Sequence, residues 1–209
     1  MSKLKKLTPA LLKKAEEHLR QSDRVMAKLI STHGPCTLNK RNFDLFHTLV
    51  VSIISQQLSA KASDTIERRI AECVPYPFNA EEMVCVPPEG LREAGLSARK
   101  VAYIQGLAER VNDGLLSYEA LTSRSNDEVV ADLMEIPGIG RWTAEMFLIF
   151  GLKRMDVLAL GDAGLQRAAK MLYPKADSNG NALEKVSERW KPYRSVASWY
   201  LWRHIDGGG

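Results

Sequence analysis

The sequence predicts an all-α protein, and three observations support this prediction. Apolar residues recur at helical spacing along most of the 209-residue chain. No segment shows the sustained apolar–polar alternation of an exposed strand. Proline, glycine and capping residues divide the chain into pieces of helical length. Because 45% of the residues are hydrophobic and 26% are charged, we expect a globular protein with a sizeable core, formed as a single domain over residues 1–209.

The first helix is expected over residues 9–19, because Thr8 can cap it and Pro9 suits the first helical position. The segment 43–57 is strongly apolar at helical spacing and is expected to be buried. The other expected helices cover residues 23–32, 59–73, 80–84, 91–95, 98–113, 117–121, 126–134, 142–152, 162–172, 183–189 and 193–203.

Charge and cysteine content restrict the class of protein. The net charge of +4 fits an anionic partner without proving one. Cys36, Cys73 and Cys85 form no CxxC pair, so we expect a reduced, cytoplasmic protein, associated with the nucleoid if bacterial. The basic N-terminus has no long apolar run, and no apolar stretch is long enough to span a bilayer, so no membrane partner is expected.

Residues 136–145 read IPGIGRWTAE and predict a tight turn in front of a helix. Gly138 and Gly140 permit backbone angles that are closed to other residues, and they remove side chains from the surface of the turn. The helix that begins near Arg141 would offer backbone N–H groups and the positive end of its dipole to a phosphate. The alternative is a plain helical hairpin with no ligand, which the residues alone favour equally.

A second segment, DVLALGDAGLQRAAKML at 156–172, places Asp162 at the start of a helix. The commoner role of such an aspartate is to cap the helix, which stabilises it by about 1 kcal/mol. The same hydrogen bonds and the helix dipole would also keep the carboxylate ionised. A fixed carboxylate of this kind is suited to stabilising a cation that develops beside it.

The hairpin LMEIPGIGRWTA followed by GDAGLQR resembles the helix-hairpin-helix DNA glycosylases of the endonuclease III superfamily. SIISQQLSAKASDTI at 52–66 and WKPYRSVASWYLWR at 190–203 are similar to the 3-methyladenine DNA glycosylase II branch. The resemblance covers roughly residues 40–205 and implies two helical subdomains with a DNA-binding cleft between them. It also implies a hairpin over about 128–152 and a catalytic loop and helix over about 156–172.

The resemblance implies roles for several residues around a flipped base. Asp162 would stabilise the oxocarbenium character that develops on the sugar when the N-glycosidic bond breaks. Trp142 and Trp202 would line the base pocket, where aromatic faces suit a cationic alkylated purine. Met146 stands where some relatives have an aromatic residue. Core packing is the alternative for any tryptophan and is favoured for Trp190 and Trp199.

Other positions would contact DNA. By resemblance, the DNA backbone would be bound by the hairpin residues Gly138, Ile139, Gly140, Arg141 and Thr143. Gln57 matches the intercalating position of the family, and Leu58 is a second candidate. A solvated helix C-terminus is an equally good interpretation of these two residues.

The sequence also bears on cofactors and on the type of cleavage. The lysine nucleophile of the glycosylase/lyases follows the last Gly-Arg pair of the hairpin, where this chain has Trp142, so water is the expected nucleophile. No cysteine lies beyond Cys85, so no iron–sulfur cluster and no required cofactor are expected. Family similarity implies a Na+ or K+ ion on the hairpin carbonyls of Met134, Ile136 and Ile139.

These observations predict a monomeric, monofunctional repair enzyme that binds damaged double-stranded DNA. It would flip out alkylated purines such as 3-methyladenine and 7-methylguanine and hydrolyse the N-glycosidic bond, leaving an abasic site. Two alternatives stay open: a non-catalytic helix-hairpin-helix DNA-binding module, and a glycosylase for deaminated or etheno bases.

Overall fold

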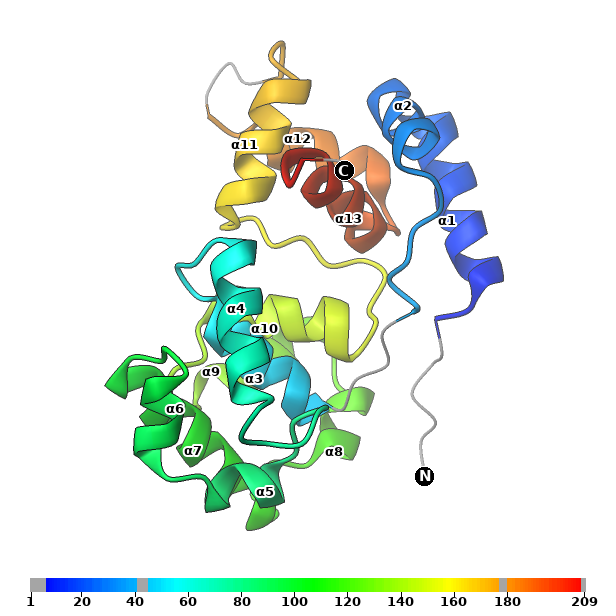
Figure 1. Cartoon of the computed structure of the whole chain (residues 1–209). Coiled ribbons are helices and arrows are strands. Elements are labelled where there is room, and N and C mark those ends of the chain that lie inside the picture. Colours follow the sequence, from blue (N-terminus) through cyan, green and yellow to red (C-terminus); the bar gives the residue numbers. More distant parts are fainter. Residues whose placement is uncertain (1–6, 41–44, 177–179, 208–209) are drawn as a thin grey trace. The chain divides into compact units, whose positions relative to one another are not determined.

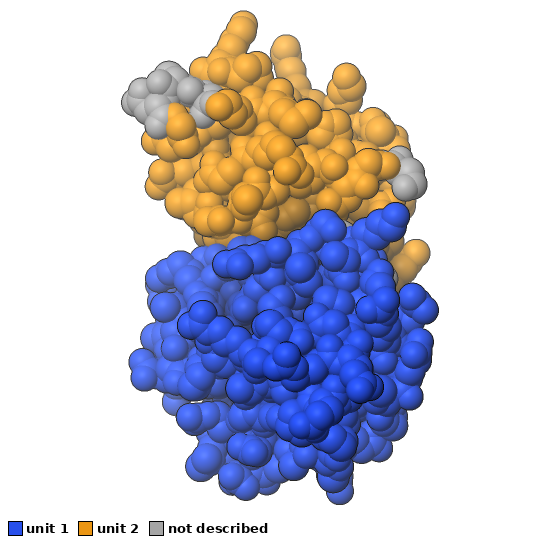
Figure 2. All heavy atoms as spheres, turned by 60° about the vertical axis from the view of Figure 1, so that its left-hand side comes forward, with its two compact units in different colours: residues 1–4, 42–152 blue, residues 5–41, 153–209 orange. Residues whose placement is uncertain are grey.

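The computed structural model describes residues 7–40, 45–176 and 180–207, and all regular structure in these ranges is helical. The expected all-α class is therefore confirmed. The chain divides into two compact units, coloured separately in Figure 2. Unit 1 comprises residues 1–4 and 42–152, and unit 2 comprises residues 5–41 and 153–209. Within the described ranges, no helix is both long and apolar enough to cross a membrane.

Unit 1 holds the hairpin and also Gln57 and Leu58, the two candidates for the intercalating position, which we call the wedge residues. Its helices, labelled in Figure 1, are α3 (Leu45–Ser55), α4 (Ala60–Ile70), α5 (Ala80–Cys85), α6 (Pro88–Glu93), α7 (Ala98–Asn112), α8 (Tyr118–Ser123), α9 (Asn126–Met134) and α10 (Arg141–Met146), and α10 continues into a π-helical turn over Phe147–Gly151.

Helix α3 forms the centre of unit 1. Nine of its eleven residues are buried, including His47, Thr48 and Ser52. A helix that is apolar on nearly all sides has to be covered on nearly all sides. Accordingly, α4, α7, α10 and the π-helical turn all pack against α3. This packing places the C-terminus of α3 beside the hairpin helix α10.

Unit 2 is assembled from two separate stretches of the chain. Its helices are α1 (Pro9–Ser22), α2 (Arg24–His33), α11 (Ala163–Leu172), α12 (Ala182–Ser187) and α13 (Arg194–Ile205), with a 3-10 turn over Glu188–Trp190. Helix α13 packs against α1, α2 and α11. The first and last parts of the described chain therefore share one core.

Most helices begin where the sequence predicts, because side-chain caps fix their starts. Thr8 caps α1 as expected. Several predicted bounds were wrong in detail. The helix expected over 43–57 ends at Ser55, and the helix expected over 59–73 ends at Ile70. Helix α6 begins at Pro88 rather than Leu91, since proline is well suited to the first turn of a helix. The expected helix 142–152 begins at Arg141 and becomes π-helical after Met146. Phe43, at the expected start of the 43–57 helix, lies outside the described residues.

Candidate active site and DNA interface

Asp162 begins α11 as the sequence predicts. Its Oδ1 atom accepts a hydrogen bond from the backbone N–H of Leu165 at 2.8 Å. The residue is only 8% exposed. A carboxylate in this position is fixed in direction by the first turn of the helix and lies at the positive end of the helix dipole.

Trp202, on α13, lies against this carboxylate. Its indole N–H donates to Asp162 Oδ1 at 3.1 Å. Gly164 makes the close approach of α11 and α13 feasible at this point. A Cβ atom on Gly164 would lie 2.8 Å from Ile205 Cδ1 and 3.1 Å from Asp162 Oδ1. The two residues that the sequence assigned to catalysis and to the base pocket, Asp162 and Trp202, are thus in direct contact.

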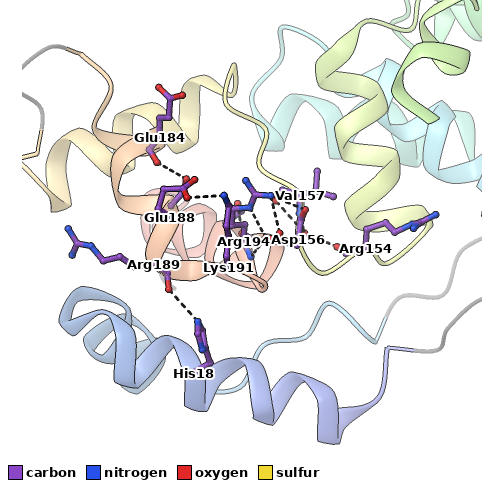
Figure 3. A network of polar contacts seen from close by, with 12 residues as sticks. His18, Arg154, Asp156, Val157, Glu184, Glu188, Arg189, Lys191 and Arg194 are labelled. Carbon is purple, nitrogen blue, oxygen red and sulfur yellow. Dashed lines mark hydrogen bonds and ion pairs between the residues drawn. The ribbon is translucent and has the colours of Figure 1, made fainter. Parts of the chain in front are cut away.

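Hydrogen bonds join the irregular segment 153–162, which leads to Asp162, to the start of α13 (Figure 3). Asp156 pairs with Arg194 through two bonds: Arg194 Nε to Oδ1 at 2.6 Å and Arg194 Nη2 to Oδ2 at 3.0 Å. Ser195 Oγ donates to the carbonyl of Arg154 at 2.7 Å and accepts from the N–H of Val157 at 3.1 Å. The bidentate pair of Asp156 and Arg194 fixes the orientation of both side chains.

The two ends of the same segment are also held. At its end, Gln166 Nε2 donates to the carbonyl of Leu160 at 2.7 Å. At its start, Lys153 adopts a left-handed conformation with φ of 55°. The ammonium of Lys153 donates to the carbonyl of Leu38 at 3.1 Å, and burial lowers the pKa of this lysine to about 8. No sequence pattern predicted the contact of Lys153 with Leu38 or that of Arg194 with Asp156, because the partners are far apart in the chain.

The hairpin consists of α9, a turn and α10. Four apolar residues that flank the turn are buried: Leu133, Ile136, Ala144 and Phe147. Gly140 is the N-cap of α10, where it provides no side-chain hydrogen bond. The guanidinium of Arg141 is exposed and lies 3.7 Å from the Glu145 carboxylate one turn later. The start of α10 therefore presents a cationic side chain and an unobstructed backbone.

The two glycines of the turn have different roles, which corrects one expectation. Gly138 has φ of 89°, and a Cβ atom there would lie 2.3 Å from the ring of Tyr103. Packing against Tyr103 therefore requires Gly138, and its missing side chain does not leave open surface. Gly140, in contrast, has open space where a Cβ atom would lie. Only Gly140 of the two fits the expectation of a surface cleared for a phosphate.

The other hairpin candidates are placed as follows. Trp142 is half-buried in the first turn of α10, in unit 1, whereas Trp202 belongs to unit 2. Met146 is 5% exposed, and Ile139 is 4% exposed with its N–H bonded to the carbonyl of Ile136. Thr143 is 1% exposed, and its hydroxyl accepts a hydrogen bond from Gln56. Ile139 and Thr143 thus direct their side chains into the protein.

Gln57 adopts a left-handed conformation with φ of 57° immediately after α3, and its side chain is exposed. Leu58 beside it is 40% exposed. A left-handed residue other than glycine costs on the order of 1–3 kcal/mol and persists only where its surroundings impose it. The sequence marked Gln57 by resemblance, but no sequence pattern predicted this backbone conformation.

The two remaining tryptophans, Trp190 and Trp199, differ in exposure. Trp190 is fully buried, as predicted, while Trp199 is half-buried with the Arg203 guanidinium 5.8 Å from its ring centre. No group of three or more His, Cys, Asp or Glu side chains within the described ranges could hold a metal ion. The expected ligands for a monovalent cation are backbone carbonyls of the hairpin turn, which that finding does not address.

Known proteins are similar to this chain in sequence and in fold. The family model described as "HhH-GPD superfamily base excision DNA repair protein" matches residues 50–192. DNA-3-methyladenine glycosylase 1 of Schizosaccharomyces pombe is 35% identical over 200 residues, which cover 92% of this chain and 87% of that protein.

Two solved structures are also similar. The crystal structure of a DNA-3-methyladenine glycosidase from Bacillus halodurans is 37% identical with a TM-score of 0.73, over 93% of this chain and 90% of that one. The Schizosaccharomyces pombe 3-methyladenine DNA glycosylase in complex with abasic DNA is 33% identical with a TM-score of 0.82, over 92% and 97% of the two chains. The resemblance predicted from the sequence is therefore confirmed, and the chain belongs to the HhH-GPD superfamily of base excision DNA repair proteins.

Proposed function

We propose that this protein is a DNA glycosylase that removes alkylated purines from double-stranded DNA by hydrolysis and leaves an abasic site. The observation that carries the proposal is the contact between Asp162 and Trp202 at the start of α11. A fixed carboxylate beside a half-buried indole suits a reaction in which cationic charge passes from a base to a sugar. The relatives named as 3-methyladenine DNA glycosylases support the choice of substrate class.

The chemistry assigned to Asp162 follows from the charge that develops during the reaction. As the bond from the sugar to the base lengthens, C1′ acquires oxocarbenium character. The ionised carboxylate of Asp162 stabilises this cation and orients water for attack on it. A purine alkylated at N3 or N7 already carries a positive charge and leaves as a neutral base. Such a base needs little help from a general acid.

Trp202 has two roles in this proposal. Its indole N–H fixes the direction of the Asp162 carboxylate, and its ring forms one wall of the pocket for the flipped base. Trp142 and Met146 are the further residues that we propose for contact with the flipped base. A cationic base stacked on an indole is stabilised by about 0.5–2 kcal/mol, which favours alkylated over normal purines.

The hairpin would bind the DNA backbone. The open surface at Gly140 and the exposed guanidinium of Arg141 suit a phosphate, which would bind through backbone N–H groups and through charge. Gln57, with Leu58 beside it, would fill the space that the flipped base leaves in the duplex. Because phosphate contacts carry no sequence information, this binding would depend on salt and not on the neighbouring bases.

Hydrolysis, rather than lyase chemistry, is proposed because Trp142 occupies the position of the lyase lysine. Burial lowers the pKa of Lys153 to about 8, and its ammonium donates to the carbonyl of Leu38. Borohydride added during turnover should trap no covalent complex with DNA. A trapped complex would instead assign an amine nucleophile to the reaction.

A monovalent cation on the carbonyls of Met134, Ile136 and Ile139 is part of the proposal. Carbonyl oxygens are suitable ligands for such a cation. The Ile136 carbonyl keeps a second lone pair after it accepts the hydrogen bond from the Ile139 N–H. Melting temperatures in K+, Na+ and tetramethylammonium chloride at equal ionic strength would test it, since a bound cation raises the melting temperature by mass action. We propose further that the protein acts as a monomer, which sedimentation with and without DNA would test.

The decisive experiment is a base-release assay on duplexes that each carry one lesion: 3-methyladenine, 7-methylguanine, a deaminated base or an etheno base. We expect release of the alkylated purines by the wild-type protein and no release by Asp162→Asn, which still binds the duplex. Binding without release of any base by the wild type would favour a non-catalytic DNA-binding module. Faster release of deaminated or etheno bases would change the substrate class and leave the reaction type intact.

A further inference from the structure

Gln57 lies in the short segment between α3 and α4, which several hydrogen bonds hold in place. The residue itself has φ of 57°, one of only two positive values among the described residues other than glycine. The segment after α3 continues with two backbone hydrogen bonds, Gln56 N–H to Ile53 carbonyl at 3.3 Å and Leu58 N–H to Ser55 carbonyl at 3.1 Å. The second bond closes a β-turn with Gln57 at its third position, where a positive φ usually falls to glycine or asparagine rather than to glutamine.

Lys100, at the start of α7, binds two backbone carbonyls that precede Gln57. Its ammonium donates to the carbonyl of Ile54 at 2.7 Å and to the carbonyl of Gln56 at 2.8 Å. The two carbonyls belong to the last turn of α3 and to the residue that directly precedes Gln57. One cation therefore fixes the peptide group whose orientation sets φ of Gln57. The Lys100 side chain is half-buried, and this burial lowers its pKa.

The side chain of Gln56 connects the same segment to the hairpin. Its amide Nε2 donates to the carbonyl of Gly138 at 2.8 Å and to the hydroxyl of Thr143 at 2.9 Å. Both donor hydrogens of the amide are thereby used, and both acceptors flank the Gly140 surface of the turn. The candidate wedge and the candidate phosphate site are thus linked through one side chain within unit 1.

We propose that Lys100 and Gln56 are positioning residues that hold Gln57 in its left-handed conformation, with its side chain exposed and ready to enter the duplex. The inference rests on the proposed function, in which Gln57 replaces the flipped base. Preorganisation matters here because a wedge that samples several conformations acts only in the fraction of molecules that has the competent one. Neither residue needs to touch the base or the sugar for this role.

The test compares paired and unpaired lesions, because a wedge matters only where a base has to leave a paired stack. We would measure kcat/KM for one 7-methylguanine in a fully paired duplex and in single-stranded DNA of the same sequence. For Lys100→Met and for Gln56→Met, we expect kcat/KM on the duplex to fall roughly tenfold while the value on the single strand changes by less than about twofold. Lys28→Met, at an exposed lysine of unit 2, controls for the lost charge and should not change the ratio.

A second measurement separates loop geometry from general damage. Asparagine tolerates the left-handed region better than glutamine, so the effect of Lys100→Met should shrink to under about twofold when Gln57→Asn is already present. Strict additivity of the two substitutions would overturn the proposal. So would an unchanged ratio of duplex to single-strand activity in Gln56→Met, which can be measured even if Lys100→Met fails to fold.

The proposed function can fail separately. Absence of base release by the wild-type protein on every lesion would reject the glycosylase assignment itself. Release by the wild type with the same duplex preference in all variants would reject only the role of Lys100 and Gln56. Fluorescence of 2-aminopurine placed next to the lesion in the fully paired duplex, read in the Asp162→Asn background, reports the opening of the stack without cleavage and should be weaker in Lys100→Met.

Discussion

Two aspartates of unit 2, Asp23 and Asp162, occupy the same local position and differ in their surroundings. Each is the N-cap of a helix, and each accepts an indole N–H at 3.1 Å, from Trp190 and Trp202 respectively. Trp190 is fully buried, however, whereas Trp202 is half-buried. The sequence around a capping aspartate therefore does not separate a structural role from a chemical one.

The remaining contacts of Asp23 show a structural role. Its Oδ1 atom accepts from the N–H groups of Val25 and Met26 at 2.8 and 3.3 Å, and its Oδ2 atom accepts from the hydroxyl of Tyr173 at 3.0 Å. Burial, followed by the charge of Asp23, raises the pKa of Tyr173, so this hydroxyl stays a donor. The Asp23 carboxylate ties the start of α2 to residues of the second half of unit 2.

The two aspartates differ in the residue that each contacts and in the exposure of that residue. Asp23 directly follows one helix and begins the next. Asp162 ends an irregular segment that Arg194 and Ser195 hold in place. To hold the Asp162 carboxylate in one place, the backbone of the irregular segment has to be ordered, and this ordering costs conformational entropy. A carboxylate that only caps a helix does not need such an ordered segment.

The sharpest test of the comparison is Asp162→Asn against Asp23→Asn. The first change should lower kcat by roughly a thousandfold or more, because the charge that stabilises the developing cation is lost, while the melting temperature changes little. Activity of Asp23→Asn should instead follow the fraction of folded protein. Base release and thermal melting of both variants check this. Near-normal turnover by Asp162→Asn would remove the distinction between the two residues.

Stability should show the opposite order. Asp23→Ala leaves the Tyr173 hydroxyl and the Trp190 N–H buried without their acceptor, so the free energy of unfolding should fall by about 3 kcal/mol. Asp162→Ala should cost about 1 kcal/mol, mainly the lost cap. Urea unfolding of the two variants measures the difference. An equal loss in both would mean that Asp162 is as structural as Asp23.

The hairpin contains a second pair of like residues with different neighbours. Gly138→Ala should lower the free energy of unfolding by roughly 2 kcal/mol, because the new Cβ atom meets the Tyr103 ring and the backbone is left-handed. Gly140→Ala should cost about 1 kcal/mol or less and weaken binding to damaged and undamaged duplexes alike. Denaturation and DNA titration of both variants give the two values. Selective loss of binding to one lesion in Gly140→Ala would contradict the phosphate role.

The two indoles can be compared by substitution with phenylalanine. Trp202→Phe keeps an aromatic face but removes the donor to Asp162, and kcat should fall about tenfold as the carboxylate loses its fixed direction. Trp190→Phe should leave kcat of the folded protein unchanged and lower the melting temperature. Single-turnover rates, which report the chemical step, are the appropriate measurement. Unchanged rates in Trp202→Phe would confine that residue to packing.

The smallest expected effect concerns the segment before Asp162, which begins with Lys153. Burial lowers the pKa of Lys153 to about 8, from an ordinary value of 10.5. Between these two pH values the unfolded chain binds more protons than the folded one, so this lysine makes the free energy of unfolding rise with pH. Lys153→Met should remove that rise. Denaturation midpoints of wild type and variant from pH 7 to 10 test this, and parallel curves would contradict it.

The sequence predicted the fold class and most helix positions because caps and apolar spacing are local signals. The sequence predicted Asp162 as a cap, and resemblance assigned Trp202 to the base pocket, but their contact joins positions 40 residues apart and no local pattern encodes it. The left-handed Gln57 and the contacts of Lys100 were missed for the same reason. Gly138 was predicted to clear a surface because a glycine pattern does not reveal which side chain occupies the space beside it.

The division of unit 2 into two stretches has a consequence for how the gene can be cut. The family model matches residues 50–192, and a fragment with those boundaries would lack α1, α2 and all of α13. It would retain Asp162 but lose the indole that contacts it and the arginine that anchors its loop. Residues 42–152, in contrast, are continuous and carry the hairpin together with the wedge segment. Exchange of this stretch between relatives should therefore be made at residues 42 and 152, which interrupts none of the described helices.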